Sequence, residues 1–281
     1  MSTDKFYITE ANITEYIFYH ITEEHAASTI DKYTQIIRDF AGFANGSEIT
    51  KQLVINWENE LKKTHKITSV NTMLTAVNGF FAYFNLNIKM KLLKIQKNTF
   101  IPQSKILTKS DYERLIETAR EQKDELMALL MQTLGSTGIR IGELKFITVE
   151  AAQEGKSEVT NKSKTRIVFI PKELNKRLLT YAKKCGITSG GIFVTRSGKP
   201  LDRSNISRRI KKIGKAAGIE ESKLFCHNFR RLFAVSFYSK SRDLSKLADL
   251  LGHSRLDTTR IYIMESGASH LKIIESMQMI I

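Results

Sequence analysis

Two arginines, two histidines and a tyrosine in the C-terminal two thirds of the chain form a set that could carry out phosphoryl transfer. They are Arg140 in Thr-Gly-Ile-Arg, His227 and Arg230 in His-Asn-Phe-Arg, His253 in Leu-Gly-His, and Tyr262 nine residues further on. Guanidinium groups bind phosphate oxygens through paired hydrogen bonds, imidazoles transfer protons, and a phenol oxygen can be a nucleophile. Such a set could attack a DNA phosphodiester without a metal ion.

The local sequence around these residues supports part of this interpretation. Arg140 follows a glycine at an apparent helix start, and a helix N-terminus is a favourable place for an anion. His227 and Arg230 are spaced by about one helical turn, which puts them on one face. Taken alone, the arginines could form structural ion pairs, and His253 and Tyr262 could be packing residues.

The motifs resemble those of the tyrosine recombinases, the family of phage integrases and Xer-type recombinases. The matching segments are Thr-Gly-Ile-Arg-Ile-Gly-Glu-Leu at 137–144, His-Asn-Phe-Arg at 227–230, and Leu-Gly-His-Ser at 251–254, which continues into Thr-Thr-Arg-Ile-Tyr at 258–262. The resemblance extends from Leu107 to about Met264. Each motif alone is weak, but their order and separation together make the resemblance specific.

The resemblance implies a role for each of the five residues. Arg140 and Arg230 would hold the non-bridging oxygens of the scissile phosphate and stabilise the transition state. His227 and His253 would hydrogen-bond the same phosphate and assist proton transfer. Tyr262 would form a 3′-phosphotyrosine and release a 5′ hydroxyl.

The same resemblance implies a catalytic lysine and a supporting glutamate. The family has a lysine in the turn between its second and third strands, as general acid towards the leaving 5′ oxygen. Lys162 is the preferred match, since it stands four residues before Arg166, and Lys164 is the alternative. Glu143 matches an acidic position expected to orient Arg140 or to tie helices together.

Hydrophobic periodicity predicts the elements that must hold these residues. We expect a helical bundle for a DNA-binding domain over residues 1–95, a linker over 96–107, and a catalytic domain over 108–281. The catalytic domain is expected to be mainly α with a small antiparallel sheet of about three strands within 148–171. The helical patterns of this domain lie at 173–184, 203–217, 229–239 and 243–251 and again around Tyr262.

The predicted helix at 203–217 has an apolar stripe and a basic stripe, a pattern that suits a helix lying along DNA as well as a solvated face. Arg231 adds charge after the second arginine motif. The residues predicted to contact DNA are Arg203, Arg208, Arg209, Lys211, Lys212, Lys215, Arg231 and Lys164.

Charge and cysteine content limit the class of protein. The first hundred residues carry 11 Lys and Arg against 10 Asp and Glu, whereas the remaining residues carry 33 against 19, a net charge of +14. Such an excess predicts a polyanionic partner. The two cysteines, Cys185 and Cys226, have no metal-ligand spacing, and no signal peptide or membrane span is evident, so a cytoplasmic protein without a metal or other cofactor is expected.

The resemblance implies a recombinase that breaks and rejoins double-stranded DNA, acting as a dimer on each site and a tetramer at synapsis, and the excess of positive charge agrees with a DNA partner. The apolar tail beyond Glu265 is expected to pack on a neighbouring protomer or on its own domain. A type IB topoisomerase-like enzyme and a non-cutting DNA-binding accessory protein are the alternatives. The Tyr262→Phe substitution separates the accessory protein from the two cutting enzymes.

Overall fold

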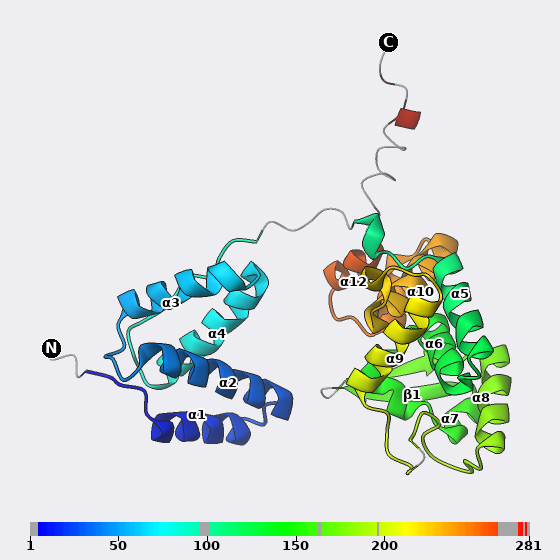
Figure 1. Cartoon of the computed structure of the whole chain (residues 1–281), viewed down its shortest axis with the longest axis horizontal. Coiled ribbons are helices and arrows are strands. Elements are labelled where there is room, and N and C mark those ends of the chain that lie inside the picture. Colours follow the sequence, from blue (N-terminus) through cyan, green and yellow to red (C-terminus); the bar gives the residue numbers. More distant parts are fainter. Residues whose placement is uncertain are drawn as a thin grey trace. The chain divides into compact units, whose positions relative to one another are not determined.

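The chain divides into two compact units, residues 1–97 and 98–281, each with a hydrophobic core of its own (Figure 1). The structure is a computed structural model and describes residues 5–95, 102–161, 164–195, 197–263, 275–277 and 279. No helix in this described part is long and apolar enough to span a membrane.

The N-terminal unit is built from four helices. They are α1 (Glu10–Thr22), α2 (Ala27–Ala44), α3 (Lys51–Thr64) and α4 (Ile67–Tyr83). Thr9 and Thr50 cap α1 and α3, because each hydroxyl accepts a hydrogen bond from a backbone N–H of the first turn. After α2 the chain turns at Asn45, whose backbone is left-handed (φ 45°).

Aromatic side chains fill the core of this unit. Phe40, Phe80 and Phe81 are fully buried, and Trp57 packs on Phe40 with 4.9 Å between ring centroids. The aromatic residues Phe80 and Phe81 at the end of α4 are therefore packing residues. The segment after α4 returns along this helix, where the side-chain amide of Asn78 both donates to and accepts from the backbone of Met90.

The C-terminal unit contains helices and, within the described residues, a two-stranded sheet. Before the sheet come η1 (Gln103–Lys105), α5 (Lys109–Glu121), α6 (Glu125–Thr137), η2 (Ile141–Phe146) and α7 (Val149–Glu154). The sheet consists of β1 (Lys156–Asn161) and β2 (Lys164–Phe169). After it come α8 (Lys172–Lys184), α9 (Arg203–Ala216), η3 (Glu221–Lys223), α10 (Cys226–Ser241), α11 (Leu244–Leu251) and α12 (Leu256–Ile263). The sheet contacts α7, η2 and α11.

The sheet is smaller than the sequence predicted. The two strands pair antiparallel, from Lys156 opposite Phe169 to Asn161 opposite Lys164. About three strands were expected, but within the described residues the start of this stretch forms the short helix α7. Thr148 begins that helix, since its hydroxyl accepts a hydrogen bond from the N–H of Ala151, and helix-forming residues follow.

Helix α6 lies at the centre of the C-terminal unit and packs against α5, α8, α9 and α10. Its buried side chains include Met127, Leu130 and Leu134. A second, smaller apolar cluster joins α10, α11 and α12 and contains Leu251 and Tyr262. Thus α6 leads into the turn before η2, while the smaller cluster fixes α12 beside α10.

Candidate active site

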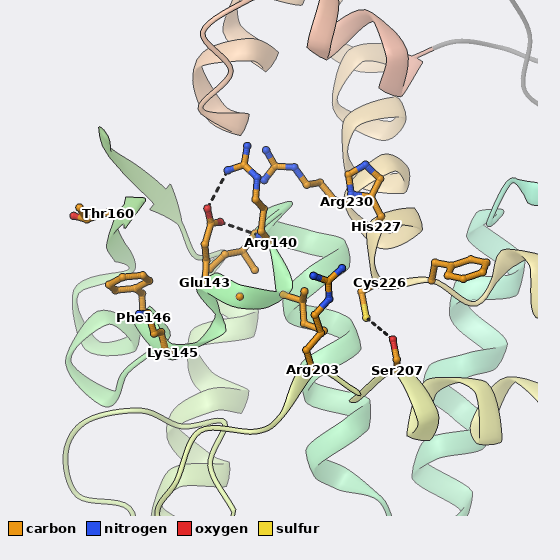
Figure 2. Close-up of a pocket in the computed structure, with 14 residues that line it drawn as sticks. Arg140, Glu143, Lys145, Phe146, Thr160, Arg203, Ser207, Cys226, His227 and Arg230 are labelled. Atoms are coloured by element: carbon orange, nitrogen blue, oxygen red, sulfur yellow. Dashed lines mark hydrogen bonds and ion pairs between the residues drawn. The ribbon is translucent and has the colours of Figure 1, made fainter. Parts of the chain in front are cut away.

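A cavity of about 490 Å³ opens where η2, β1, α9 and α10 meet (Figure 2). Arg140, His227 and Arg230 all line it, so the structure brings three of the predicted catalytic residues to one place. Its lining residues are Ile139, Arg140, Ile141, Gly142, Glu143, Lys145, Phe146, Thr160, Arg203, Ser207, Phe225, Cys226, His227 and Arg230.

Arg140 is placed by a tight turn and by a buried carboxylate. Gly138 ends α6 in a left-handed conformation (φ 64°), and Arg140 then stands at the N-terminal cap of η2. Glu143 is only 3% exposed and accepts from the Arg140 backbone N–H and from its Nη1, both at 2.9 Å. Burial alone would raise the pKa of Glu143, but these hydrogen bonds and the charge of Arg166 hold it below its usual range.

Arg230 projects from α10 into the interior and is 1% exposed. Its Nη1 donates to the carbonyl of Gly138 at 2.5 Å, and its Nη2 donates to the carbonyl of Leu251 at 2.5 Å. Burial, followed by the charge of Arg140, lowers the pKa of Arg230 to about 10. The side chain therefore stays cationic at neutral pH, and its buried Nε atom has no hydrogen-bond partner within the described residues.

The ring of Tyr262 contacts the rings of both histidines. Its centroid is 4.9 Å from that of His227 and 5.3 Å from that of His253. The guanidinium carbon of Arg230 is 5.8 Å from the Tyr262 centroid. The predicted nucleophile is 7% exposed and belongs to the apolar cluster of α10, α11 and α12, so in this structure it is largely buried.

Both histidines have lowered pKa values. Burial comes first among the causes for His253, followed by the charges of Arg230 and Arg140, and together they lower its pKa to about 4. Loss of water and then the charge of Arg230 also lower the pKa of His227. Both rings are therefore neutral near pH 7, the state in which an imidazole nitrogen that carries no proton can accept one.

The predicted lysines are not located by the structure. Lys162 lies outside the described residues, and Lys164 begins β2 but its side chain is not among those described. Arg231, predicted as a DNA contact, is 7% exposed and does not line the cavity. One residue beyond Arg230 on the helix, its side chain is directed about 100° away around the axis.

The cations of α9 divide into two groups. Arg203, Arg208, Lys212 and Lys215 are exposed, as a surface for DNA requires. Two others, Arg209 and Lys211, form ion pairs with carboxylates of the same unit. Arg209 Nη2 is 2.6 Å from both carboxylate oxygens of Asp124, and Lys211 Nζ is 2.6 Å from Glu221 Oε1.

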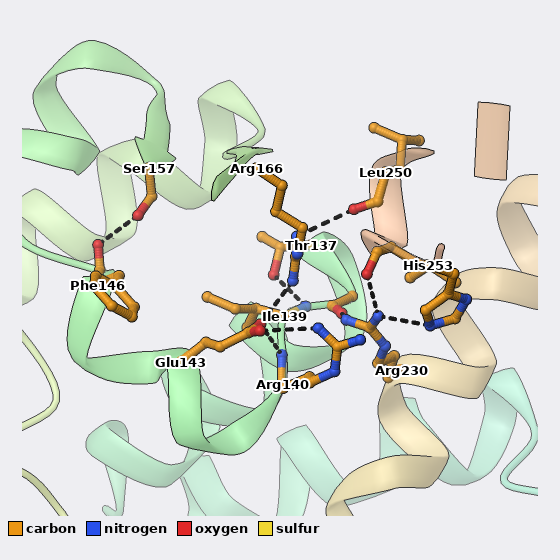
Figure 3. A network of polar contacts seen from close by, with 12 residues as sticks. Thr137, Ile139, Arg140, Glu143, Phe146, Ser157, Arg166, Arg230, Leu250 and His253 are labelled. Carbon is orange, nitrogen blue, oxygen red and sulfur yellow. Dashed lines mark hydrogen bonds and ion pairs between the residues drawn. The ribbon is translucent and has the colours of Figure 1, made fainter. Parts of the chain in front are cut away.

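Two residues at the site escaped the sequence analysis. Arg166 on β2 donates to Glu143 Oε2 at 2.7 Å, and Thr259 Oγ1 is 2.8 Å from Nδ1 of His253 (Figure 3 shows Arg166 and His253). A cation within a largely β-branched and aromatic strand was the signal for Arg166, and Thr259 stood within the matched motif at 258–262 without an assigned role. In the described part of the chain, no three His, Cys, Asp or Glu residues lie close enough to form a metal site.

Comparison with known families matches residues 105–268 to the Phage integrase family. Because this match spans more than half of the chain, the protein belongs to that family, as the motifs indicated. Among its relatives, tyrosine recombinase XerA of Pyrococcus furiosus is 28% identical over 272 residues, 92% of this chain and 91% of the relative. Tyrosine recombinase XerC of Thermodesulfovibrio yellowstonii is 26% identical over 283 residues, 93% and 92% of the two chains.

Solved structures support the fold. The crystal structure of XerA recombinase aligns over 98% of this chain and 100% of its own, with 26% identity and a TM-score of 0.55. A lambda integrase dimer bound to a COC′ core site aligns with a TM-score of 0.75 over 92% and 96% of the chains, at 18% identity. The predicted mainly α fold with a small antiparallel sheet is confirmed.

Proposed function

We propose that this chain is a site-specific recombinase that breaks and rejoins DNA strands through a 3′-phosphotyrosine intermediate. The observation that carries the proposal is the convergence of three basic groups, Arg230, His227 and His253, on one tyrosine within a single compact unit. Arg230 and His253 share a hydrogen bond, and the rings of His227 and His253 contact Tyr262. Relatives that align over nearly the full chain are named tyrosine recombinases, which supports the same activity.

In the cleavage step, the phenol oxygen of Tyr262 attacks phosphorus. The oxygen–phosphorus bond forms as the bond to the 5′ oxygen breaks, and the phenol proton passes to a neighbouring imidazole. Arg140 and Arg230 stabilise the charge that grows on the non-bridging oxygens. Lys162, or Lys164 in its place, protonates the leaving 5′ oxygen.

The phosphotyrosine keeps the energy of the original phosphodiester. Attack by a 5′ hydroxyl from another strand therefore reverses the chemistry and releases the Tyr262 phenol. No ATP is needed, because one phosphoester is exchanged for another. Two such exchanges, through a Holliday junction, complete recombination between two sites.

The proposal includes the arrangement on DNA. Residues 1–95 would act as a core-binding domain, residues 96–107 as a linker and residues 108–281 as the catalytic domain. Arg203 and the exposed cations of α9 would contact phosphates. A dimer per site and a tetramer at synapsis are proposed, in keeping with a neighbour of the same fold solved as a tetramer on a Holliday junction. The tail after Glu265, which lies almost entirely outside the described residues, would pack on a neighbouring protomer or on its own domain.

Covalent capture tests the proposal. The protein is mixed with fragmented genomic DNA from its source in the presence of EDTA and denatured, and the DNA attached to protein is sequenced. We expect adducts at one or a few loci, lost in Tyr262→Phe and kept in the matched control Tyr238→Phe. Adducts that persist in Tyr262→Phe would refute the assignment of the nucleophile.

Two other outcomes identify the alternatives. Salt-sensitive DNA binding without adducts indicates a non-cutting accessory protein. Adducts at scattered sites, together with relaxation of supercoiled plasmid and no strand exchange, indicate a topoisomerase-like enzyme.

A further inference from the structure

Arg166 on β2 is a largely buried cation that connects three elements of the site (Figure 3). Its side chain is 11% exposed. Nη2 donates to Glu143 Oε2 at 2.7 Å, and Nη1 donates to the carbonyl of Leu250 at 3.1 Å. One guanidinium fork thus joins the β-hairpin to η2 on one side and to the end of α11 on the other.

The first of these contacts controls Arg140 through Glu143. One carboxylate oxygen of Glu143 accepts from Arg140 Nη1, and the other is shared between the Arg140 backbone N–H and Arg166. Because the two guanidinium groups bind different oxygens, Arg166 fixes the plane of the carboxylate. Without Arg166, the carboxylate would be held only by the two hydrogen bonds from Arg140 itself, and the guanidinium of Arg140 would lose its connection to the β-strand.

The second contact controls the turn that carries His253. Arg166 and Arg230 bind consecutive carbonyls, those of Leu250 and Leu251, at the C-terminus of α11. Cations are favoured at this end of a helix, where carbonyls lack partners within the helix. Gly252 follows with φ 64°, and a Cβ there would overlap the side chain of Arg166.

We infer that Arg166 is a positioning residue for the proposed strand cleavage. It acts by orienting Arg140 through Glu143 and by holding the turn that places His253 beside Arg230. The inference rests on the proposed function, to which it adds a residue that does not itself line the cavity. The alternative is that Arg166 acts through the proposed general acid, Lys162 or Lys164, because Arg166 lies on the strand that Lys164 begins.

The test compares Arg166→Gln with Arg177→Gln as a matched control. Arg177 also binds one carboxylate and one neutral oxygen, those of Glu173 and Gln132, but on the exposed face of α8. Single-turnover cleavage is measured on the DNA fragment that the wild-type protein captures. A second substrate carries sulfur in place of the bridging 5′ oxygen, because a thiolate leaves without a general acid.

Arg166→Gln is expected to bind DNA normally and to cleave both substrates about 10²-fold more slowly, as a small misplacement of catalytic groups does. Arg177→Gln should cleave at the wild-type rate. Recovery of the wild-type cleavage rate on the sulfur substrate would overturn the inference, since Arg166 would then act through the general acid that protonates the leaving group. An unchanged rate on the ordinary substrate would overturn it as well. If Arg166→Gln does not fold, Arg166→Lys takes its place in the same assays and is expected to cleave slowly as well. Lysine keeps the positive charge but lacks the planar guanidinium group that binds two acceptors at once.

A measurement without DNA separates this inference from the proposed function. Inorganic phosphate is titrated into the protein, and binding is followed by the NMR signals of the His227 and His253 rings. We expect phosphate to bind more weakly to Arg166→Gln than to the wild type or to Arg177→Gln. Equal binding would overturn the positioning role even if DNA adducts form. Weakened binding in a protein that forms no adducts would show that Arg166 positions the phosphate-binding groups, while the recombinase proposal itself would fail.

Discussion

The Nη2 atom of Arg230 lies 3.1 Å from Nε2 of His253. A guanidinium group has donors only, so Nε2 must accept this hydrogen bond. The proton of the neutral ring is then assigned to Nδ1, which donates to Thr259 Oγ1 at 2.8 Å. In the absence of DNA, His253 is therefore fixed in one tautomer by one of the arginines proposed to bind phosphate.

This relationship predicts an unusually acidic histidine. The ring of His253 is expected to titrate with a pKa of about 4, because burial and the charges of Arg230 and Arg140 oppose its protonation. NMR of the ring signals against pH measures this value, with His253→Gln providing the assignment. A pKa close to the ordinary 6.5 would contradict the described geometry.

The same shift makes stability depend on pH. The folded pKa of His253, about 4, lies below the unfolded value of 6.5, so its neutral ring contributes stability above about pH 6.5. That contribution is lost as the pH falls from about 6.5 through about 4. In urea unfolding, the free-energy advantage of the wild type over His253→Gln should shrink between these limits. An advantage that stays constant or grows would contradict the sign of the shift.

Glu143→Gln is predicted to destabilise the C-terminal unit. The substitution leaves the guanidinium groups of Arg140 and Arg166 without their shared counter-charge, and breaking a buried ion pair typically costs about 3–5 kcal/mol. Because Arg140 is partly exposed to water, we expect a smaller cost, about 2–3 kcal/mol, in urea unfolding.

Glu173→Gln is the matched control for that measurement. Its partner Arg177 lies on the surface of α8, where an ion pair contributes about 0–1 kcal/mol. Equal losses in the two variants would show that the buried position of Glu143 does not matter.

Gly252→Ala is predicted to cost more stability than Gly186→Ala. Both glycines have left-handed backbones (φ 64° and 69°), so each substitution carries a backbone cost of about 1 kcal/mol. Only at Gly252 would the new methyl group also overlap a neighbour, Arg166, whereas Gly186 faces open space. Thermal unfolding of the two variants isolates the packing contribution, and similar melting temperatures would contradict it.

Local signals in the sequence were sufficient to predict many of the helices and site residues of the C-terminal unit. The predicted helix at 173–184 is observed as Lys172–Lys184, because its apolar spacing is regular. Motif spacing also identified Arg140, His227, Arg230, His253 and Tyr262, which the fold brings together.

What escaped prediction depends on partners far along the chain. Arg166 binds Glu143, 23 residues before it, and Leu250, 84 residues after it. No local pattern encodes either partner. In the same way, the burial of Arg231 and the pairing of Arg209 with Asp124, 85 residues away, follow from helix packing and not from the basic stripe.

Some cations of α9 are exposed and others are paired with carboxylates, and this difference predicts how substitutions change the salt dependence of DNA binding. Removing one cation that binds a phosphate lowers the slope of log affinity against log salt by about 0.9. Replacing Arg208, Lys212 and Lys215 together by alanine should therefore lower the slope by about 2–3. Arg209→Ala should leave the slope unchanged and reduce thermal stability instead, since it removes the partner of Asp124. Fluorescence anisotropy with duplex DNA at several salt concentrations measures the slopes, and a larger change for Arg209→Ala would place the DNA on the opposite face of the helix.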